Sequence, residues 1–516
     1  MGDFPGFTAK AEEISSFVIG AHSVSVISHI DADGITAASI ADIALTRKGV
    51  PHTVHFFKKL DEAACDLVNG MEADVVWLTD LGGGYTSRFS HPGLVVCDHH
   101  PWEGKRNVDE RPKKSLFDYH DNNLRHLNPH LYGFDGSRHI SGAGVTYWVA
   151  KHMDPRNVDL SPLAIVGAVG DFQDNAEHRL VGLNRAILAD AEDAGLVRTE
   201  WDLRLFGRET RSLTKLFQYA NDPPLPGLSN DWYGARRFLV DRCRIRLQDA
   251  SKKERAWSDL DANERQRIRD ELVVCLEKQG HLDLVERAYG EIYLLIKEES
   301  GTELHEAKEF STLLNSCGRY GKEQLGLKVC LAAVYDGMTS AEEKGTQLEE
   351  ALVQLRNHRE NLIDAMNFFF SEERKGPFCE RRGSVQVLKA DGSYLLPETV
   401  TVTGPDGAEE KEVFRDTTVG IVVGMVLSSG KIKDDIPLIS MMRSDGKVKV
   451  SGRGNRRMIE RGLDLSAAMR GAAETVGGTG GGHNIAAGAT IPEDMVEGFI
   501  SAIDDLVGAQ FKGKRA

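Results

Sequence analysis

Several short apolar runs in the first hundred residues each end at a segment that carries acids or histidines. The runs and the segments that follow them are Val24–Ser28 with His29–Gly34, Asp74–Thr79 with Asp80, and Leu94–Cys97 with Asp98–His100. A further run, Thr53–Phe57, is separated from the first by Ile35–Thr46, which is rich in alanine and has helical spacing. This alternation predicts a parallel sheet with helices on its faces. Such sheets bind ligands beyond the carboxyl ends of their strands, so the polar segments are expected to meet there.

The composition is that of a globular protein with large cores. The chain has 516 residues, 41% hydrophobic and 27% charged, which is room for two or three domains. No apolar run approaches the roughly 18 residues of a membrane span. Residues 1–10 lack the basic start and apolar core of a signal peptide, and the seven cysteines form no C-x-x-C pair. A reduced, cytoplasmic protein without a membrane segment is therefore expected.

The patterns predict three regions. Residues 1–195 carry the strand–helix alternation, residues 196–375 are mostly helical in pattern, and residues 376–516 return to strand-like runs. The helices expected in the middle region are Lys252–Gln279, a helix within Leu304–Gly326, and Ser340–Phe370.

The third region has its own expected elements. Val419–Leu427 and Leu438–Met442 have strand-like composition, and a turn at Ser444-Asp445-Gly446 would join the second of them to Lys447–Val450 as a hairpin. We expect an exposed polar loop at Pro397–Lys411 and a disordered tail at Lys512–Ala516.

The acids and histidines at the predicted sheet edge have the composition of a metal site. Asp31 and Asp33 are two residues apart, so a turn after the strand can aim both carboxylates at one centre. Asp80 could bridge two ions, His99 offers a nitrogen ligand, and Asp171 completes the shell. Two divalent ions about 3.5–4 Å apart can activate a water and neutralise the charge that builds on a phosphodiester during hydrolysis. Oxygen ligands with one imidazole suit Mn²⁺ or Mg²⁺.

Each of these residues also has a structural alternative. Asp33 before a glycine is common in turns, and Asp171 could cap a helix. Asp98 could orient His99 through a hydrogen bond instead of binding an ion. Their combination in one α/β region favours the metal site. The cysteine and histidine spacing does not fit structural zinc, and the chain lacks the Gly-x-x-x-x-Gly-Lys-Ser loop of nucleotide-driven proteins.

These segments resemble the motifs of the DHH phosphoesterase superfamily. The matching segments, in order, are His29–Gly34, Thr79-Asp80, Asp98-His99-His100 and Gly170-Asp171. The signature of the DHH-associated substrate-binding domain is resembled by Gly480-Gly481-Gly482-His483 followed by Ala486-Ala487-Gly488. Length and the segments Ala307–Phe310 and Leu313–Arg319 are most similar to archaeal RecJ-like exonucleases, relatives of the RecJ-like subunit of the eukaryotic replicative helicase.

The resemblance implies an α/β fold and a role for each motif residue. The fold would comprise an N-terminal parallel-sheet DHH domain, a helical connecting region and a C-terminal α/β substrate-binding domain. The residues that would hold two Mn²⁺ ions, with Mg²⁺ as the alternative, are Asp31, Asp33, Asp80, His99 and Asp171. His100 would contact the scissile phosphate. Many members place their first histidine four residues before the first aspartate, whereas His29 lies two before Asp31, so His29 is an additional candidate ligand.

A basic stretch in the third region is the candidate nucleic-acid contact. Residues 431–470 contain ten lysines and arginines but five acids, in a chain whose net charge is −15. Arg453 follows a predicted strand, and arginine suits bidentate contact with phosphate. Backbone N–H groups in Gly480–Gly482, just before His483, can approach an anion without obstruction by side chains. From charge alone, an ordinary mixed surface is the alternative.

A second glycine-containing segment has two interpretations. Ser141-Gly142-Ala143-Gly144 opens an apolar helix. Its first N–H groups could hold a phosphate. Equally, its glycines could let the helix start pack closely against the sheet.

The sequence thus predicts a two-metal exonuclease that hydrolyses single-stranded DNA or RNA stepwise, in replication or repair. The first and third regions would face each other across a cleft, one holding the metals and the other feeding the strand. The enzymatic alternative is a phosphodiesterase of short oligonucleotides or cyclic dinucleotides, although the helical middle region favours a polymer. The Gly480–Gly488 signature disfavours a pyrophosphatase. The non-enzymatic alternative is a replication scaffold that binds the GINS complex.

Overall fold

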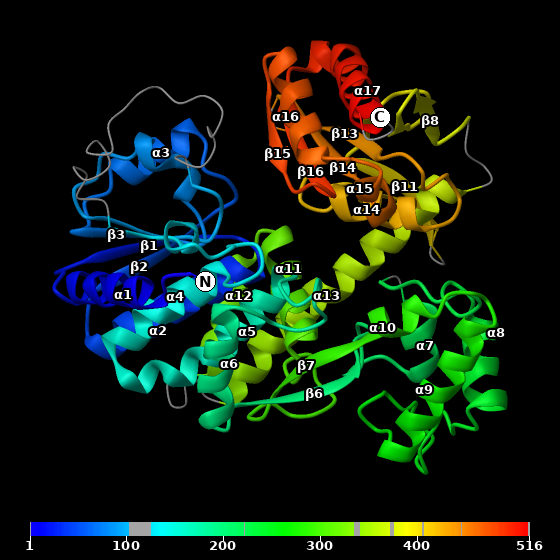
Figure 1. The fold of residues 1–516 in the computed structure, drawn as a ribbon, viewed down its shortest axis with the longest axis horizontal. Coiled ribbons are helices and arrows are strands. Elements are labelled where there is room, and N and C mark those ends of the chain that lie inside the picture. The colour runs from blue at the N-terminus through cyan, green and yellow to red at the C-terminus, as the bar shows by residue number, and fades with distance from the viewer. Residues whose placement is uncertain are drawn as a thin grey trace. The chain divides into compact units, whose positions relative to one another are not determined.

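The computed structural model describes residues 2–102, 125–220, 222–334, 341–371, 376–404, 407–444 and 446–513. The chain divides into two compact units, Met1–Leu355 and Arg356–Ala516, which are treated one at a time below. Figure 1 shows the elements of both units, coloured along the chain. Among the described residues, no helix combines the length and the apolar character that crossing a bilayer requires.

The first unit begins with a five-stranded sheet in the order β2-β1-β3-β4-β5, and all of its pairings are parallel. The strands are β1 (Val24–His29), β2 (His52–Phe57), β3 (Val75–Thr79), β4 (Leu94–Cys97) and β5 (Arg125–Leu127). The predicted runs differ from the first four strands by one residue at most, so the α/β prediction is confirmed.

Both faces of this sheet are covered, which explains why its strands are unbroken apolar runs. The helical elements are α1 (Phe4–Ile19), α2 (Ala32–Lys48), α3 (Glu62–Asn69), η1 (Gly83–Arg88), η4 (Pro129–Tyr132), α4 (Gly142–Met153), η5 (Pro155–Leu160), α5 (Ser161–Gly170) and α6 (Leu183–Asp193). Val26 and Trp77 pack with α1, α2, α4 and α5, whereas Ile27 and Leu78 pack with α3. In Figure 1, α3 accordingly lies across the sheet from α1 and α2.

A helical domain follows, enclosed by an antiparallel strand pair. The pair is β6 (Val197–Leu203) and β7 (Tyr289–Leu295). Between them lie α7 (Leu213–Gln218), α8 (Trp232–Arg237), η6 (Phe238–Arg242), α9 (Ala262–Glu277) and α10 (Asp283–Ala288). They surround their own core, which contains Phe217, Trp257 and Leu272. The predicted helical character of this region is confirmed. Its two strands were not predicted, and in β6 charged residues interrupt the apolar pattern of a strand.

One predicted helix in this domain starts later than expected. Lys252–Gln279 was predicted as one helix, but α9 begins at Ala262 and residues 252–261 form turns and a short bridge. Asp261 and Glu264 form a reciprocal capping box at the start of α9. Such a box provides hydrogen-bond acceptors for the first N–H groups of the helix, so the helix begins at this position.

The remaining predicted helices of the middle region are confirmed. They are α11 (Ala307–Arg319) and α13 (Ala341–Phe370), with α12 (Glu323–Val334) between them. α11 packs against α2 and α5 and thereby joins the core under the parallel sheet.

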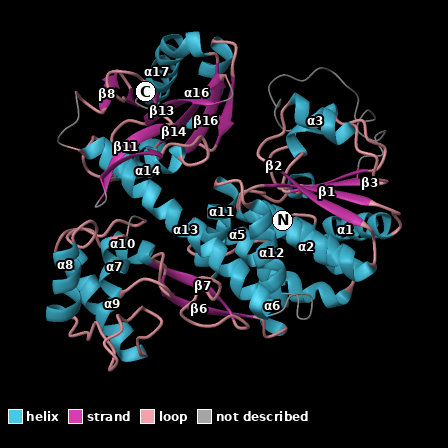
Figure 2. Ribbon diagram, turned by 180° about the vertical axis from the view of Figure 1, so that it is seen from behind, coloured by secondary structure: helices cyan, strands magenta, loops and turns pink. Residues whose placement is uncertain are grey.

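The second unit is built on a mixed seven-stranded sheet. The order is β15-β16-β14-β13-β9-β8, and β10 pairs with β13. The strands are β8 (Cys379–Arg382), β9 (Val385–Leu388), β10 (Leu395–Leu396), β13 (Leu438–Ser444), β14 (Lys447–Arg453), β15 (Thr479–Gly482) and β16 (Ala486–Ile491). The helices are α14 (Val419–Ser428), α15 (Arg456–Glu460), α16 (Leu465–Thr475), η7 (Glu493–Met495) and α17 (Val496–Gly513). Figure 2 shows this sheet from behind with α16 and α17 beside it.

Two predictions for the second unit are wrong. Val419–Leu427 is the helix α14 and not a strand, because a short apolar run fits a buried helix as well as a strand. Pro397–Lys411 is not a loop: β11 (Thr399–Gly404) and β12 (Gly407–Glu412) pair antiparallel across it. Alternating threonine and valine in β11 favour a strand.

Parts of other predictions lie outside the described residues. These are Pro405 and Asp406 of the predicted loop, Asp445 of the predicted turn, and 514–516 of the predicted tail. The strands on either side of Asp445 do pair antiparallel, as the hairpin prediction required. Lys512 and Gly513 belong to α17, so the tail prediction is wrong for these two residues.

Candidate metal centre

The ends of β1, β3 and β4 bring their polar segments into one cluster. Nδ1 of His29 lies 2.8 Å from Oδ2 of Asp31 and 3.8 Å from Oδ2 of Asp80. Nε2 of His99 lies 3.2 Å from the other oxygen of Asp80. Asp171, at the end of α5, places Oδ2 3.8 Å from Nδ1 of His99. The structure therefore gathers residues from four separate parts of the sequence at the sheet edge where we expected them.

Asp80 is the residue at the centre of this cluster. Its side chain is buried, and neither carboxylate oxygen accepts a hydrogen bond from the described residues. Its φ is 60°, and the close approach of α4 requires glycine at 142, where a Cβ would lie 2.5 Å from Cβ of Asp80. Left-handed backbone at a residue other than glycine costs energy and often marks a functional site. A buried carboxylate without a donor needs a positive partner, so Asp80 fits a metal ligand.

His99 is oriented as a metal-binding imidazole. Its Nδ1 lies 2.7 Å from the carbonyl oxygen of Gly136, to which it donates a hydrogen bond. That bond leaves Nε2 without a proton in the neutral ring, directed at Asp80 and Asp33. A histidine whose second nitrogen is held by a carbonyl is the usual form of a metal-ligating histidine.

Asp98 was considered as a hydrogen-bond partner that orients His99. In the structure it orients His100 instead. Nδ1 of His100 lies 2.9 Å from Oδ1 of Asp98, and the other oxygen of Asp98 accepts the N–H of Gly83 at 2.7 Å. Burial and the charge of His99 oppose protonation of His100, but the charge and hydrogen bond of Asp98, together with the charge of Asp80, outweigh them and raise the pKa to about 9. The His100 side chain is half exposed. It therefore presents a cationic edge to the surface beside Asp80.

Asp33 connects the loop after β1 to the start of α4. Its two carboxylate oxygens accept the N–H groups of Gly142 at 2.7 Å and Ala143 at 3.0 Å. The helix start therefore holds a carboxylate of the chain itself, and close packing is the interpretation of this glycine-containing segment that the structure supports. Each carboxylate oxygen has a second lone pair, and Oδ2 of Asp33 lies 3.6 Å from Nε2 of His99.

Helix α11 holds the loop after β1 from outside the sheet. Oδ1 of Asn315 accepts the N–H of Ala32 at 3.0 Å. A Cβ at Gly318 would collide with the carbonyl oxygen of Ile30, so the helix and the loop touch through backbone atoms. Burial lowers the pKa of Arg319 to about 10, against the pull of Asp31. From the sequence alone, this segment was not predicted to contribute to the site.

The charges of the cluster favour a divalent ion. Burial, and then the charges of Asp33 and Asp31, raise the pKa of Asp80 well above its ordinary value. Burial also raises the pKa of Asp171 to about 6, although His99 counteracts it. These shifts are those of buried carboxylates that also repel one another at close range. Three groups of ligand atoms lie close enough to share an ion: Asp80, Asp98, His99 and His100; His29, Asp31 and Asp80; and Asp33, His99 and Asp171.

Metal binding at neutral pH is expected to release protons. Burial disfavours protonation of His99, but Asp171, Asp33 and Asp98 outweigh it and raise the pKa to about 9. The ring is thus protonated at pH 7 and must lose a proton to bind an ion, so affinity for Mn²⁺ should rise with pH up to about 9. Calorimetry of Mn²⁺ binding in buffers of different ionisation enthalpy measures the number released. His99→Gln should release about one proton fewer, whereas a binding enthalpy independent of buffer would contradict the assignment.

Gln173 is a site residue that the sequence analysis missed. Its Nε2, whose two hydrogens are shared among three acceptors, lies 2.9 and 3.1 Å from the carbonyl oxygens of Gly136 and Ile140 and 3.1 Å from Oδ2 of Asp171. It thereby fixes both a ligand candidate and the carbonyl that orients His99. Its only sequence signal is its position two residues after Asp171, which many unrelated glutamines share.

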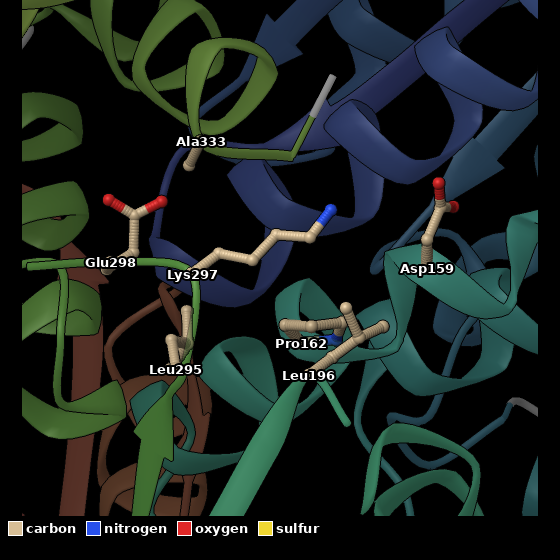
Figure 3. A pocket seen from close by; sticks show the side chains of 7 residues that line it. All are labelled: Asp159, Pro162, Leu196, Leu295, Lys297, Glu298 and Ala333. Atoms are coloured by element: carbon tan, nitrogen blue, oxygen red, sulfur yellow. The ribbon is translucent and has the colours of Figure 1, made fainter. Parts of the chain in front are cut away.

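A small pocket lies apart from the cluster. It is lined by Asp159, Pro162, Leu196, Leu295, Lys297, Glu298 and Ala333 (Figure 3). Its volume of about 20 Å³ is enough for a water molecule. None of its lining residues belongs to the candidate metal set, so the pocket has no part in the site.

The predicted nucleic-acid residues lie in the second unit. The guanidinium of Arg453, at the end of β14, donates to the carbonyl oxygen of Gly452 at 2.8 Å, and burial lowers its pKa. A Cβ at Gly420 of α14 would collide with it. No carboxylate among the described residues pairs with Arg453, whereas Arg443 pairs with Glu493. Arg453 therefore remains a candidate for contact with an outside anion.

The glycine-rich segment is the edge strand β15. It pairs with β16 on one side only. Gly480 is required for packing, because a Cβ there would lie 2.6 Å from the carbonyl oxygen of Met469 in α16. Gly481 faces open space, and His483 is exposed in the turn that follows. The structure therefore leaves Gly481 and His483 accessible, while Gly480 has a packing role.

Two domain families match this chain. A DHH-CID domain matches residues 205–284, and a DHHA1 domain matches residues 408–509. The chain carries two domains of the DHH phosphoesterase superfamily. Within this superfamily the CID match covers most of the helical domain between β6 and β7, and the DHHA1 match covers the β13–β16 part of the second sheet. The superfamily prediction is thereby confirmed.

Known relatives match over nearly the whole chain. An uncharacterized protein of Methanocaldococcus jannaschii is 27% identical over 494 residues, 95% of this chain and 94% of its own length. The structure of CDC45 from Entamoeba histolytica matches with a TM-score of 0.57, at 10% identity, over 98% of both chains. RecJ from Thermus thermophilus, in complex with Mn²⁺, matches with a TM-score of 0.52, at 15% identity, over 98% of this chain and 55% of that chain. This chain thus spans about half the length of that RecJ, and these structures share its fold.

Proposed function

We propose that this chain is a two-metal phosphodiesterase that shortens single-stranded DNA or RNA stepwise, in replication or repair. The observation that supports this most directly is the buried carboxylate of Asp80, which lacks hydrogen-bond donors among the described residues and lies between His29 and His99. The residues proposed to hold the ions are His29, Asp31, Asp33, Asp80, His99 and Asp171. Two bound divalent ions, with Mn²⁺ as the first choice, would activate a water and neutralise the phosphate.

The side chains around the ions have separate tasks in this proposal. His99 presents Nε2 to the ion, Gly136 keeps the ring in that orientation, and Gln173 holds the carbonyl of Gly136. His100 stays protonated at neutral pH through Asp98 and offers a positive charge to the scissile phosphate. A fixed cation aimed at developing negative charge favours the transition state over the ground state.

We assign a separate task to each part of the chain. Residues 1–195 would hold the metals, residues 196–375 would connect, and residues 376–516 would bind nucleic acid. Arg453, the accessible Gly481 in Gly480–Gly482, and His483 are the proposed contacts of the last part.

Arg453→Ala is expected to weaken binding of an oligonucleotide at least about ten-fold, because the bound phosphate loses its half-buried guanidinium partner. Mn²⁺ binding should be unchanged. Arg443→Ala removes a charge of the same stretch that Glu493 already neutralises, so it is the matched control and should change binding by less than about two-fold. Fluorescence anisotropy in a chelator measures nucleic-acid binding, and calorimetry measures the metal. Equal loss of Mn²⁺ in Arg453→Ala would contradict the division between the two units.

The proposed function has a direct test. End-labelled single-stranded DNA and RNA, each with either end blocked, are incubated with the protein in Mn²⁺, and the products are resolved by size. We expect mononucleotides, abolished by a chelator, and less cleavage of the same sequence as a blunt duplex. The blocked end that stops the reaction defines the polarity. Absence of hydrolysis of every substrate in both Mn²⁺ and Mg²⁺ would refute the proposal.

The same experiment separates the alternatives. Activity on dinucleotides or cyclic dinucleotides alone would favour the short-substrate phosphodiesterase. A replication scaffold that binds GINS is the second candidate, and the match to CDC45 over 98% of both chains favours it. Size-exclusion chromatography with the GINS complex of the same organism would test it independently, since complex formation and hydrolysis can coexist.

A further inference from the structure

Exposed arginines and aromatic rings gather in one segment of the helical domain between β6 and β7. Residues 232–253 contain seven lysines and arginines but only two acids, in a chain of net charge −15. The same segment opens with two exposed aromatic side chains, Trp232 at 41% and Tyr233 at 73%. A basic segment in an acidic chain that also exposes large rings is unusual for an inert surface.

Helix α8 places part of this segment on one face. Its start is fixed by Asp231, whose side chain accepts the N–H of Gly234 at 2.8 Å. Gly234 and Ala235 face inward, while Tyr233, Arg236 and Arg237 are exposed. These three are spaced i, i+3 and i+4, so they are neighbours on the outer face of the helix.

The segment after η6, the helical turn that follows α8, adds two more arginines. Ile245 donates its N–H to the carbonyl oxygen of Leu239 at 2.9 Å. Cys243, Ile245 and Leu247 are buried in the domain core, while Arg244 and Arg246 between them are exposed. Burial of every second residue therefore directs both guanidinium groups to solvent from an anchored segment.

Most of these charges have no partner of their own. In the described part of the chain, the guanidinium groups of Arg237, Arg244 and Arg246 meet neither a carboxylate nor a hydrogen-bond acceptor. Arg242 differs, since it pairs with Glu271. The guanidinium of Arg236 lies over the ring of Trp232 at 5.6 Å, and the rings of Trp232 and Tyr233 contact edge to face at 5.0 Å. Like charges without partners in one short segment repel one another, so an anion would stabilise this segment.

We propose that this surface, formed by Trp232, Tyr233, Arg236, Arg237, Arg244 and Arg246, is a second nucleic-acid contact that binds single strands. It rests on the proposed action on nucleic acid and adds a contact in the connecting region. Guanidinium groups bind phosphates, and exposed rings stack on unpaired bases without requiring a sequence. Bases and phosphates alternate along a single strand, so exposed rings beside guanidinium groups match both parts of that ligand. The contact would hold a polymer beyond the few nucleotides at the metal centre.

Charge reversal at the two anchored arginines tests the proposal. The full-length Arg244→Glu/Arg246→Glu protein is compared with Lys278→Glu/Lys328→Glu, which makes the same charge change at two exposed lysines, one at the end of α9 and one in α12. Binding of labelled oligo-dT of about 30 nucleotides, a length that spans several binding positions, is measured in a chelator over a salt series. The arginine variant should bind at least about ten-fold more weakly, and its salt slope should fall by about 0.7 for each phosphate that it no longer binds. Wild-type affinity and slope in this variant would overturn the proposal.

The aromatic part has its own test. Tyr233→Ala should weaken oligo-dT binding about five-fold or more, whereas Tyr233→Phe, which keeps the ring, should bind like wild type. Competition by polyglutamate as effective as that of oligo-dT would overturn the assignment to nucleic acid and indicate an acidic protein. Hydrolysis of a dinucleotide should be unchanged in all these variants. A wild-type protein that binds oligo-dT through this surface but hydrolyses nothing would refute the proposed function and leave this inference intact. If the wild-type protein hydrolyses nucleic acid and the arginine variant binds oligo-dT with wild-type affinity, this inference is refuted and the proposed function stands.

Discussion

Asp80→Asn is expected to lose hydrolysis of nucleic acid by about 10³-fold or more in saturating Mn²⁺. The substitution preserves the shape of the side chain but removes the negative charge that two ions would share. Initial rates on end-labelled single strands give the loss. Asp66→Asn, which makes the same change at an exposed position of α3, is the matched control and should retain wild-type rates.

Asp80→Asn should also be more stable than wild type when no metal is bound. The pKa of Asp80 is raised by burial and by Asp33 and Asp31, so its ionised form destabilises the metal-free fold. That penalty grows as pH rises above the ordinary range of aspartate, and an amide does not carry it. We expect a gain of about 1–3 kcal/mol at neutral pH and loss of the rise in Tm that Mn²⁺ gives wild type. Near wild-type, chelator-sensitive turnover by Asp80→Asn would show that the centre has been assigned wrongly.

Gly318→Ala is expected to disable the centre from a distance. A methyl group there would collide with the carbonyl oxygen of Ile30, and neither backbone can yield without moving α11 or the loop that carries Asp31. Overpacking of this kind costs about 1–3 kcal/mol of stability, and a ligand displaced by about 1 Å can cost about 10²-fold in rate. Thermal unfolding and initial rates measure the two effects.

The control for this variant is Gly345→Ala. Gly345 is an exposed position in α13, and a Cβ there meets nothing within 4 Å. It should gain about 0.5–1 kcal/mol, because alanine favours a helix interior over glycine. If both variants keep wild-type rates, then α11 does not support the centre as described.

The first sheet could be predicted closely because its strands are buried on both faces. Burial of alternate residues in two cores, as for Val26 and Ile27, produces unbroken apolar runs with clear ends. The same kind of apolar run led to a wrong strand prediction at Val419–Leu427. This segment is a helix that packs against β13 and β14, and that packing cannot be predicted from the run itself. The capping box at Asp261 can be recognised in the sequence. The residues before it have the same charged periodicity as the helix, so the helix was predicted to start too early.

For the candidate site, motif residues were predictable and their supports were not. Asp31, Asp80 and His99 follow strands, so their meeting follows from the parallel topology. The roles of Asp98 and Gln173 depend on which way each side chain turns from a fixed backbone position. Asn315 contacts Ala32 across 283 positions of sequence, and no local pattern carries such a contact.

That last contact also bears on the order in which this protein is made. Every candidate ligand has been synthesised by Asp171, while the helix that holds the ligand loop ends at Arg319. A nascent chain that has emerged only through α6 carries the complete ligand set without its outer support. The ribosome would have to add the whole CID segment before α11 could dock. A metal ion that binds during synthesis would therefore bind while the loop after β1 lacks its contact with α11. Completion of the centre is thereby tied to completion of the first unit.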